Sequence, residues 1–386
     1  MPTGLRPLLS RNPAEGHRAA TQLELFFDLV SVIAIAAVTE TLHHGISEAH
    51  GLPMLVNFIA LFVVIWWAWM NYTWFASAFD NGDMGFVLLT FVIITGALVF
   101  AGAVSGITTS LDFGTAIFGW IIMRVGMIGL WLRAAADNPA YRRTALRYAG
   151  GIALAQILWI VFYLMVPAGS TAFLPLYALI FGVELLVPVQ AERAHATPWH
   201  RHHIIERYGL LNIIVLGEVM VSLALIFGKI YDGHLELPLV VVGLSGLVVV
   251  FSLWWFYFVE PEHLKTTDLP RALLWGYGHV LVFGCGALVA AGLGAVMDVA
   301  GHHSEISATE ANRWLAAPVA GYLFALWLIR DRCLEGLFAR YSLLAGAALI
   351  GVLALIGTPV WVVAMALVLL VGLRAQGVQA PSPHSA

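Results

Sequence analysis

The chain alternates between long apolar stretches and short polar segments. About twelve apolar stretches are each roughly 20 residues long, which is the length that an α-helix needs to cross the hydrocarbon core of a bilayer. They lie at roughly 22–43, 55–75, 85–106, 113–133, 148–167, 172–190, 204–228, 238–259, 272–297, 314–331, 341–357 and 359–374. The pattern therefore predicts an all-α polytopic membrane protein with about twelve transmembrane helices.

Composition and charge agree with this prediction. Hydrophobic residues make up 60% of the chain and charged residues only 11%, which excludes an ordinary soluble protein. Apart from Arg124, Lys229 and Arg313, the Lys and Arg residues lie in the amino-terminal segment, the even-numbered loops and the carboxyl tail. Because cytoplasmic loops are enriched in Lys and Arg, we expect a multi-pass protein of the cell membrane with both termini in the cytoplasm.

The two halves of the chain resemble each other. Trp66-Trp67 in the second stretch corresponds to Trp254-Trp255 in the eighth, and a Gly-Ala-Leu-Val sequence follows both Thr95 and Cys285. The two offsets are about 188 and 190 residues, and six helices per half is an even number. The sequence thus predicts two parallel six-helix repeats, related by a pseudo-two-fold axis along the membrane normal.

This plan divides the chain into five parts. We expect a cytoplasmic amino-terminal tail, a first repeat, a basic and histidine-rich cytoplasmic linker, a second repeat and a disordered carboxyl-terminal tail, at residues 1–21, 22–190, 191–203, 204–374 and 375–386. In the linker, His200, His202 and His203 lack the separated pairs of a zinc site, so we expect a solvated interfacial loop and no metal site. Nothing in the sequence indicates a cofactor.

Two acidic motifs carry a family resemblance. The segments E-L-F-F-D-L-V at 24–30 and E-R-Y-G-L-L-N-I-I-V-L-G-E at 206–218 resemble the two signature segments of the bacterial low-temperature requirement protein A family. The likeness extends over most of residues 20–375 and implies an integral protein of the bacterial inner membrane. The chain departs from the family pattern at Ser31 and Tyr208.

A second resemblance concerns architecture. One class of potassium channels also has two parallel six-helix repeats, with an Asp on the first helix of each. Asp28 corresponds to that Asp in the first repeat, but Leu210 stands at the equivalent place in the second.

Five ionisable residues fall inside the apolar stretches. At about 1.5 Å per residue they share one slab in the cytoplasmic half of the membrane, with Glu218 about 18 Å deep and close to the midplane. They are Asp28, Arg124, Glu184, Glu218 and His279. Because charged groups inside a membrane face protein or water, we expect them to form a polar network.

The expected roles within this network differ. Arg124 should pair with Asp28, Glu184 or Glu218 and pin helices together. Glu218 has Asn212 and Ser222 as local polar neighbours, which favours a role in proton exchange as much as one in packing.

For the remaining candidate residues, the sequence favours roles in helix packing and capping. His279 is either a satisfied packing histidine or a proton carrier. Glu24 and Glu206 should lie at the interface and cap the first turns of their helices. The tryptophan-rich ends of the second and eighth helices are typical of an aromatic belt and of helix packing.

Two functional classes are compatible with these residues. The protein is a transporter or channel for a small solute or ion, with coupling to protons through intramembrane carboxylates as a specific form. Alternatively it is a membrane-embedded enzyme or lipid-handling protein in which Asp28, Glu184 and His279 act as acid and base groups. No nucleophile is evident, so the sequence favours transport over catalysis and leaves the enzymatic question open.

The expected partners follow from the class of protein. They are the lipid bilayer and a small solute or ion, with no nucleic acid, and the possibility of a homodimer stays open.

Overall fold

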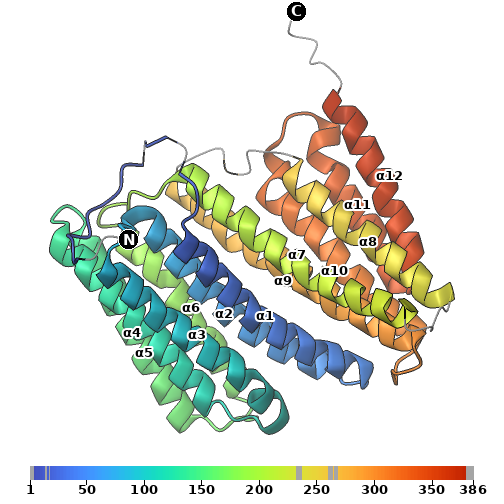
Figure 1. Cartoon of the computed structure of the whole chain (residues 1–386), viewed down its shortest axis with the longest axis horizontal. Helices are drawn as coiled ribbons and strands as arrows, with labels where there is room; N and C mark the ends of the chain where they lie inside the picture. The colour runs from blue at the N-terminus through green and yellow to red at the C-terminus, as the bar shows by residue number, and fades with distance from the viewer. Residues whose placement is uncertain are drawn as a thin grey trace, which may run out of the picture. The chain divides into compact units, whose positions relative to one another are not determined.

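The chain folds into α-helices joined by short loops. The computed structural model describes residues 4–13, 15–16, 18–231, 237–259, 264 and 268–379. Its α-helices are α1 (Gln22–Ser47), α2 (Gly51–Phe79), α3 (Met84–Ser110), α4 (Gly114–Asp137), α5 (Arg142–Met165), α6 (Phe173–Glu192), α7 (Arg201–Tyr231), α8 (Leu237–Phe258), α9 (Leu269–Ala300), α10 (Ala308–Ile329), α11 (Leu337–Ile356) and α12 (Val360–Gln379). A 3-10 helix, η1 (Asp331–Cys333), precedes α11 (Figure 1). The predicted all-α class is confirmed.

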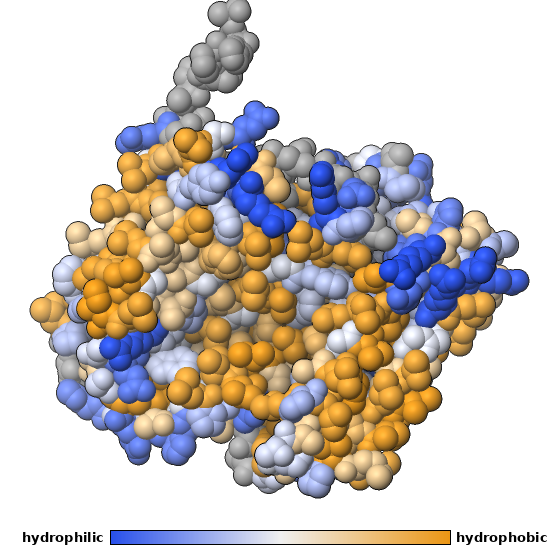
Figure 2. Space-filling view, turned by 180° about the vertical axis from the view of Figure 1, so that it is seen from behind, coloured by the Kyte–Doolittle hydropathy of each residue, from blue (hydrophilic) through white to orange (hydrophobic). Residues whose placement is uncertain are grey.

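Most of these helices are suited to a membrane. Among the described residues, ten helices are long and apolar enough to cross a bilayer, and α12 adds a shorter apolar segment, Val360–Gln376. Large apolar side chains such as Leu29, Val125 and Leu154 are each more than half exposed. Figure 2 shows hydrophobic residues over much of one face, with hydrophilic residues gathered toward its upper and right edges and at its lower left. Such a surface is stable in lipid and not in water, so the chain is a polytopic membrane protein.

Two compact units make up the molecule. Unit 1 comprises Met1–Ala37 and Val64–Arg207, and unit 2 comprises Val38–Val63 and Tyr208–Ala386. Helices α1, α2 and α7 therefore each contribute residues to both units. The two parallel repeats and the domain boundaries expected from the sequence stay predictions.

Unit 1 contains a bundle of helices that follow one another along the chain. Helix α3 packs on α4, α4 on α5 and α5 on α6 (Figure 1). The backbones of α3 and α4 approach closely, because a Cβ atom added at Gly96 would lie 2.6 Å from the carbonyl oxygen of Gly119. Small residues at such contacts let membrane helices pack tightly.

The amino-terminal segment belongs to unit 1 and contacts its helix ends. The backbone N–H of Arg6 donates to the Asp83 carboxylate at 2.9 Å, and that of Leu8 donates to Asp137 at 2.7 Å. Asp83 also caps α3 by accepting a hydrogen bond from the Phe86 N–H. These bonds fix Arg6 and Leu8 beside the polar ends of α3 and α4.

Unit 2 has a corresponding core. Helix α9 packs on α10, α10 on α11, α11 on α12 and α12 on α8. At one end Asp331 binds both Arg330, at 2.5 Å, and Arg374, at 2.9 Å. Because Arg374 lies on α12 and Arg330 ends α10, this buried triad joins the two helices.

The observed helix limits differ from the expected ones by up to six residues, at the starts of α5 and α10. Helix α10 begins at Ala308 because Ser307 caps it, accepting a hydrogen bond from the Glu310 N–H at 3.2 Å. Helix α7 begins at Arg201, within the expected linker, and α12 continues to Gln379. The remainder of the expected disordered tail, residues 380–386, lies outside the described residues.

Candidate functional site

A buried group of charges lies in unit 1, where α1 begins and where the first turns of α7 reach it. Arg207 binds Glu24 through Nη1, with an N···O distance of 2.9 Å, and binds Asp28 through Nη2. The side chains of all three residues are fully buried. We call Glu24, Asp28, His203 and Arg207 the Arg207 cluster. It places one guanidinium between two carboxylates one helical turn apart.

Local sequence positions each member of the Arg207 cluster. Thr21 and Glu24 form a capping box, in which the Thr21 N–H donates to Glu24 Oε2 at 2.8 Å and the Glu24 N–H donates to Thr21 Oγ1. The Trp69 indole N–H donates to Asp28 Oδ1 at 2.6 Å. His203 Nε2 lies 3.0 Å from Glu24 Oε1. Arg207 therefore supplies one positive charge to two buried carboxylates, and His203 adds a hydrogen-bonding contact to one of them.

The cluster also has unused hydrogen-bonding capacity. Among the described residues, the buried atoms Asp28 Oδ2, His203 Nδ1 and Arg207 Nε have no hydrogen-bond partner. Such atoms can accept or donate one further bond each. The ion pairs of the cluster thus leave these three polar atoms without a hydrogen bond.

A second buried ion pair lies deeper in unit 1. Arg124, near the middle of the 24-residue helix α4, donates to Glu184, near the middle of the 20-residue helix α6, at 2.6 Å. Glu184 also accepts the indole N–H groups of Trp67, at 2.6 Å, and Trp159, at 2.9 Å. The Arg124 guanidinium lies 3.9 Å from the Trp120 ring centroid. This environment holds the carboxylate from three sides and suits a structural role.

The predicted partners of Arg124 can now be separated. Of the three candidate carboxylates, Glu184 is the one that binds Arg124, which confirms that this arginine is paired. Asp28 binds Arg207, a residue that the sequence analysis did not single out. Arg207 follows Glu206 in a basic segment that is typical of a cytoplasmic loop, so the sequence around Arg207 gave no sign of its burial.

The motif acids differ from each other in exposure. Glu24 caps α1 as expected, but it does so from a fully buried position and also binds Arg207. Glu206 is half-buried, and its Oε1 accepts the Ala20 N–H at 3.3 Å.

The histidine row also differs from expectation. A solvated loop is wrong for His200 and His203, which are 3% and 0% exposed, although His202 is exposed. The His200 N–H donates to Ser77 Oγ at 3.0 Å, and α7 already includes His203. Packing inside unit 1 therefore positions these two histidines, and solvent does not surround them.

Two tryptophans of α2 bind buried carboxylates, a role that the sequence pattern did not predict. Trp67 and Trp69 are each 1% exposed and donate to the intramembrane acids Glu184 and Asp28. These two side chains therefore show the expected helix packing and do not belong to an interfacial belt. An indole in a belt and an indole that binds a buried carboxylate have the same sequence signature, so the pattern could not separate them.

Unit 2 holds the other expected polar residues, and the hydrogen bonds of three of them do not involve the Glu218 carboxylate. Asn212 is fully buried and pairs with the Tyr322 hydroxyl at 3.0 Å, while the Ser222 hydroxyl donates to the backbone carbonyl of Glu218 at 3.3 Å. His279 is buried, with Nδ1 bonded to the Trp275 carbonyl and Nε2 bonded to the Tyr257 hydroxyl. The structure thus gives His279 the contacts of a packing histidine.

Glu218 itself lies near the middle of the 31-residue helix α7 and is half-buried. Among the residues that the structure describes, no ion pair or side-chain hydrogen bond of its carboxylate is found. It is therefore in a different state from Asp28 and Glu184, which are both neutralised by arginine.

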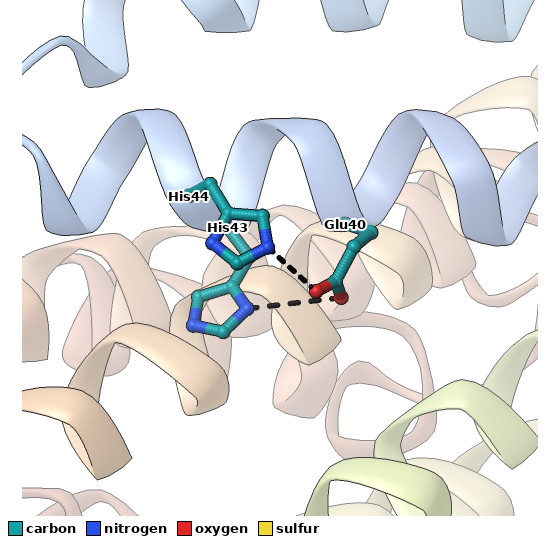
Figure 3. A group of neighbouring side chains, drawn as sticks. All are labelled: Glu40, His43 and His44. Atoms are coloured by element: carbon teal, nitrogen blue, oxygen red, sulfur yellow. Dashed lines mark ion pairs between the residues drawn. The ribbon is translucent and has the colours of Figure 1, made fainter. Parts of the chain in front are cut away.

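One group of side chains could hold a metal ion, although the sequence analysis predicted no such site. Glu40, His43 and His44, all in the last turns of α1, each offer one ligand atom within 4.8 Å of the others. Figure 3 shows both imidazole rings turned toward the Glu40 carboxylate. The sequence signal was the E-x-x-H-H spacing, which places the three side chains on neighbouring positions of one helical face.

Comparison with known proteins gives two matches. The family described as bacterial low temperature requirement A protein matches residues 19–375, which is most of the chain. An uncharacterized protein of Rhizobium meliloti (strain 1021) is 26% identical over 279 residues, covering 68% of this chain. The match spans 65% of the length of that relative.

Proposed function

The chain belongs to the bacterial low temperature requirement A protein family, and we propose that it moves a small solute or ion across the membrane, coupled to protons through Glu218. The family and the apolar helices make it a multi-pass membrane protein. Transport, its coupling and the identity of the solute are the proposal.

The observation that carries the proposal is the state of Glu218. A carboxylate near the middle of a membrane helix costs several kcal/mol unless it is paired, hydrated or protonated. Glu218 is half-buried and makes no ion pair with any described residue, so hydration and protonation are the states open to it. A carboxyl group that can exchange a proton near the midplane is what a proton-coupled transporter requires.

The other intramembrane acids support the same division of roles. Glu184 accepts three hydrogen bonds from Arg124, Trp67 and Trp159, and Asp28 accepts two from Trp69 and Arg207. Donors bind both oxygens of Glu184 and the Oδ1 atom of Asp28, so these carboxylates suit the framework of the bundle better than acid–base chemistry on a substrate. This arrangement favours transport over an enzyme that uses Asp28 and Glu184.

The location follows from charge asymmetry and family. We place the protein in the bacterial inner membrane with both termini in the cytoplasm, because the Lys and Arg residues concentrate in the corresponding loops.

Flux measurements test the proposal. Purified protein is reconstituted into liposomes, and uptake is followed across a panel of inorganic cations, anions and small organic solutes, with and without a pH gradient. We expect at least one solute to move faster than in protein-free liposomes and to respond to the gradient. Chemical change of the liposome lipids without solute movement would contradict transport and favour a lipid-handling enzyme.

A further inference from the structure

The last turns of α1 carry a group of side chains that lies outside the ion pairs of unit 1, and its one acid, Glu40, repels the Glu218 carboxylate. Glu40 and His44 are 65% and 63% exposed, whereas His43 is only 14% exposed. The His44 Nε2 atom lies 2.9 Å from Glu40 Oε1, and the His43 Nδ1 atom lies 3.8 Å from Glu40 Oε2 (Figure 3). The two rings stack with centroids 5.2 Å apart.

We propose that Glu40, His43 and His44 bind one divalent transition-metal ion of the Zn²⁺ class. The ligand set is two imidazole nitrogens and one carboxylate oxygen, which such ions prefer to Ca²⁺ or Mg²⁺. Bond lengths of about 2.0–2.1 Å place the ligand atoms of a tetrahedral site about 3.3 Å apart. The three ligand atoms lie within 4.8 Å of one another, so small side-chain rotations complete the site.

A second observation points to a ligand on His43. Its Nε2–H donates to Asp298 Oδ2 at 2.8 Å, because a carboxylate can only accept. The Ser47 hydroxyl donates to the same oxygen at 2.8 Å. Metal-binding histidines typically donate their second N–H to a carboxylate, which fixes the tautomer and the ring orientation. The other ring nitrogen, Nδ1, faces Glu40, and a metal ion would bind it in place of a proton.

The packing around His43 supports this orientation. A Cβ atom at Gly294 of α9 would lie 2.8 Å from His43 Nε2, so the ring packs directly against the backbone of α9. Asp298 lies one turn further along the same helix. Helix α9 therefore holds His43, while the exposed side chains of Glu40 and His44 remain free to close on an ion from solvent.

The site is open in the manner of an exchangeable site. Three protein ligands leave at least one coordination position for water or another donor, unlike the four ligands of a structural zinc site. The inference concerns binding and does not depend on the proposed transport function.

Zinc titration tests the proposal. Full-length protein without a polyhistidine tag is titrated with Zn²⁺ alone by calorimetry, in the presence of a competing chelator. We expect each chain to bind one Zn²⁺ ion tightly. Glu40→Gln and His44→Gln should each lower the Zn²⁺ affinity at least about tenfold, and Asp298→Asn should lower it by about tenfold. His202→Gln is the matched control, because it removes an exposed histidine that lies on α7 and not on α1. It should leave the Zn²⁺ affinity unchanged.

The coordination shell gives a second readout. X-ray absorption at the zinc edge should show two imidazole ligands in the wild type and one in His44→Gln. Because His44 is exposed, this variant should fold, which its thermal melting will establish. Equal affinity in His44→Gln and wild type, or a shell made of oxygen ligands alone, would overturn the proposal and leave Glu40–His44 as an ordinary surface ion pair.

Discussion

Arginine and tryptophan side chains determine how this protein tolerates carboxylates inside a membrane. Arg124 and Arg207 each bind acids that are fully buried, and an indole N–H supplies a further bond to each group. Removing one partner of a buried ion pair leaves the other charge uncompensated, which costs more than the pair itself contributes.

Arg124 gives the sharpest test of this principle. We expect Arg124→Ala to lower the free energy of unfolding by about 3–5 kcal/mol, because Glu184 would remain buried without its cation. The double variant Arg124→Ala/Glu184→Gln should recover part of this loss, since it removes the unpaired charge as well. Unfolding in detergent micelles measures both, with the exposed Arg143→Ala as the control. Equal stability of Arg124→Ala and wild type would contradict the structural role of the pair.

Sequence reasoning found the acids but only part of what binds them. The presence of Asp28 and Glu184 inside apolar stretches is visible in the sequence, because an acid there is exceptional. The contact of Arg207 with Glu24 joins residues 183 positions apart, and an arginine near a helix start carries no sign of burial. Which helices are neighbours is decided by tertiary packing, and a single sequence does not reveal it.

The turn between α2 and α3 contains an ionisable residue, Asp80, that lies outside the membrane-spanning helices. Burial, followed by repulsion from Glu24, raises the pKa of Asp80 to about 6 from its ordinary value of 3.8. The folded state therefore binds the Asp80 proton more tightly than the unfolded chain does. The resulting stabilisation is complete below about pH 4 and is lost as the pH rises through about 6.

Asp80→Asn removes this dependence. Asn retains an oxygen to accept the Gly82 N–H, which donates to Asp80 Oδ1 at 2.7 Å, but it carries no charge. We expect the change in melting temperature between pH 5 and pH 7.5, measured in detergent, to be smaller in Asp80→Asn than in wild type. Asp112→Asn, at an exposed loop position, serves as the control. The same pH dependence in wild type and Asp80→Asn would show that other groups cause it.

The α3–α4 contact makes a prediction about packing. A methyl group at Gly96 would lie 2.6 Å from both the Gly119 oxygen and the Met123 nitrogen, so Gly96→Ala must push the helices apart. We expect it to cost about 1–3 kcal/mol of stability. Gly102→Ala on the same helix meets no atom within 4 Å and should cause no loss. Unfolding of the two variants side by side provides the measurement, and equal stability would mean that α3 and α4 pack less closely than described.

Helix positions were largely predictable, since runs of about 20 apolar residues have few alternatives. The start of α10 was placed too late because the apolar pattern outweighed the S-x-x-E cap at Ser307. That signal was present in the sequence and would have corrected the limit.

At the scale of the whole molecule, sequence, structure and family agree on a polytopic membrane protein. The contact-defined units divide α1, α2 and α7, a property that hydropathy cannot predict because it treats each helix as indivisible. The central claim is that Glu218 exchanges protons while arginine holds Asp28 and Glu184.

Proton flux into liposomes that contain the Glu218→Gln protein tests this claim most directly. Glutamine is nearly isosteric and neutral at a half-buried position, so the variant should fold and reconstitute like the wild type. We expect it to lose all solute movement driven by a pH gradient, whereas Glu305→Gln, at an exposed loop position, should retain it. Normal gradient-driven transport by Glu218→Gln at every pH tested would contradict the account and make Glu218 a packing residue.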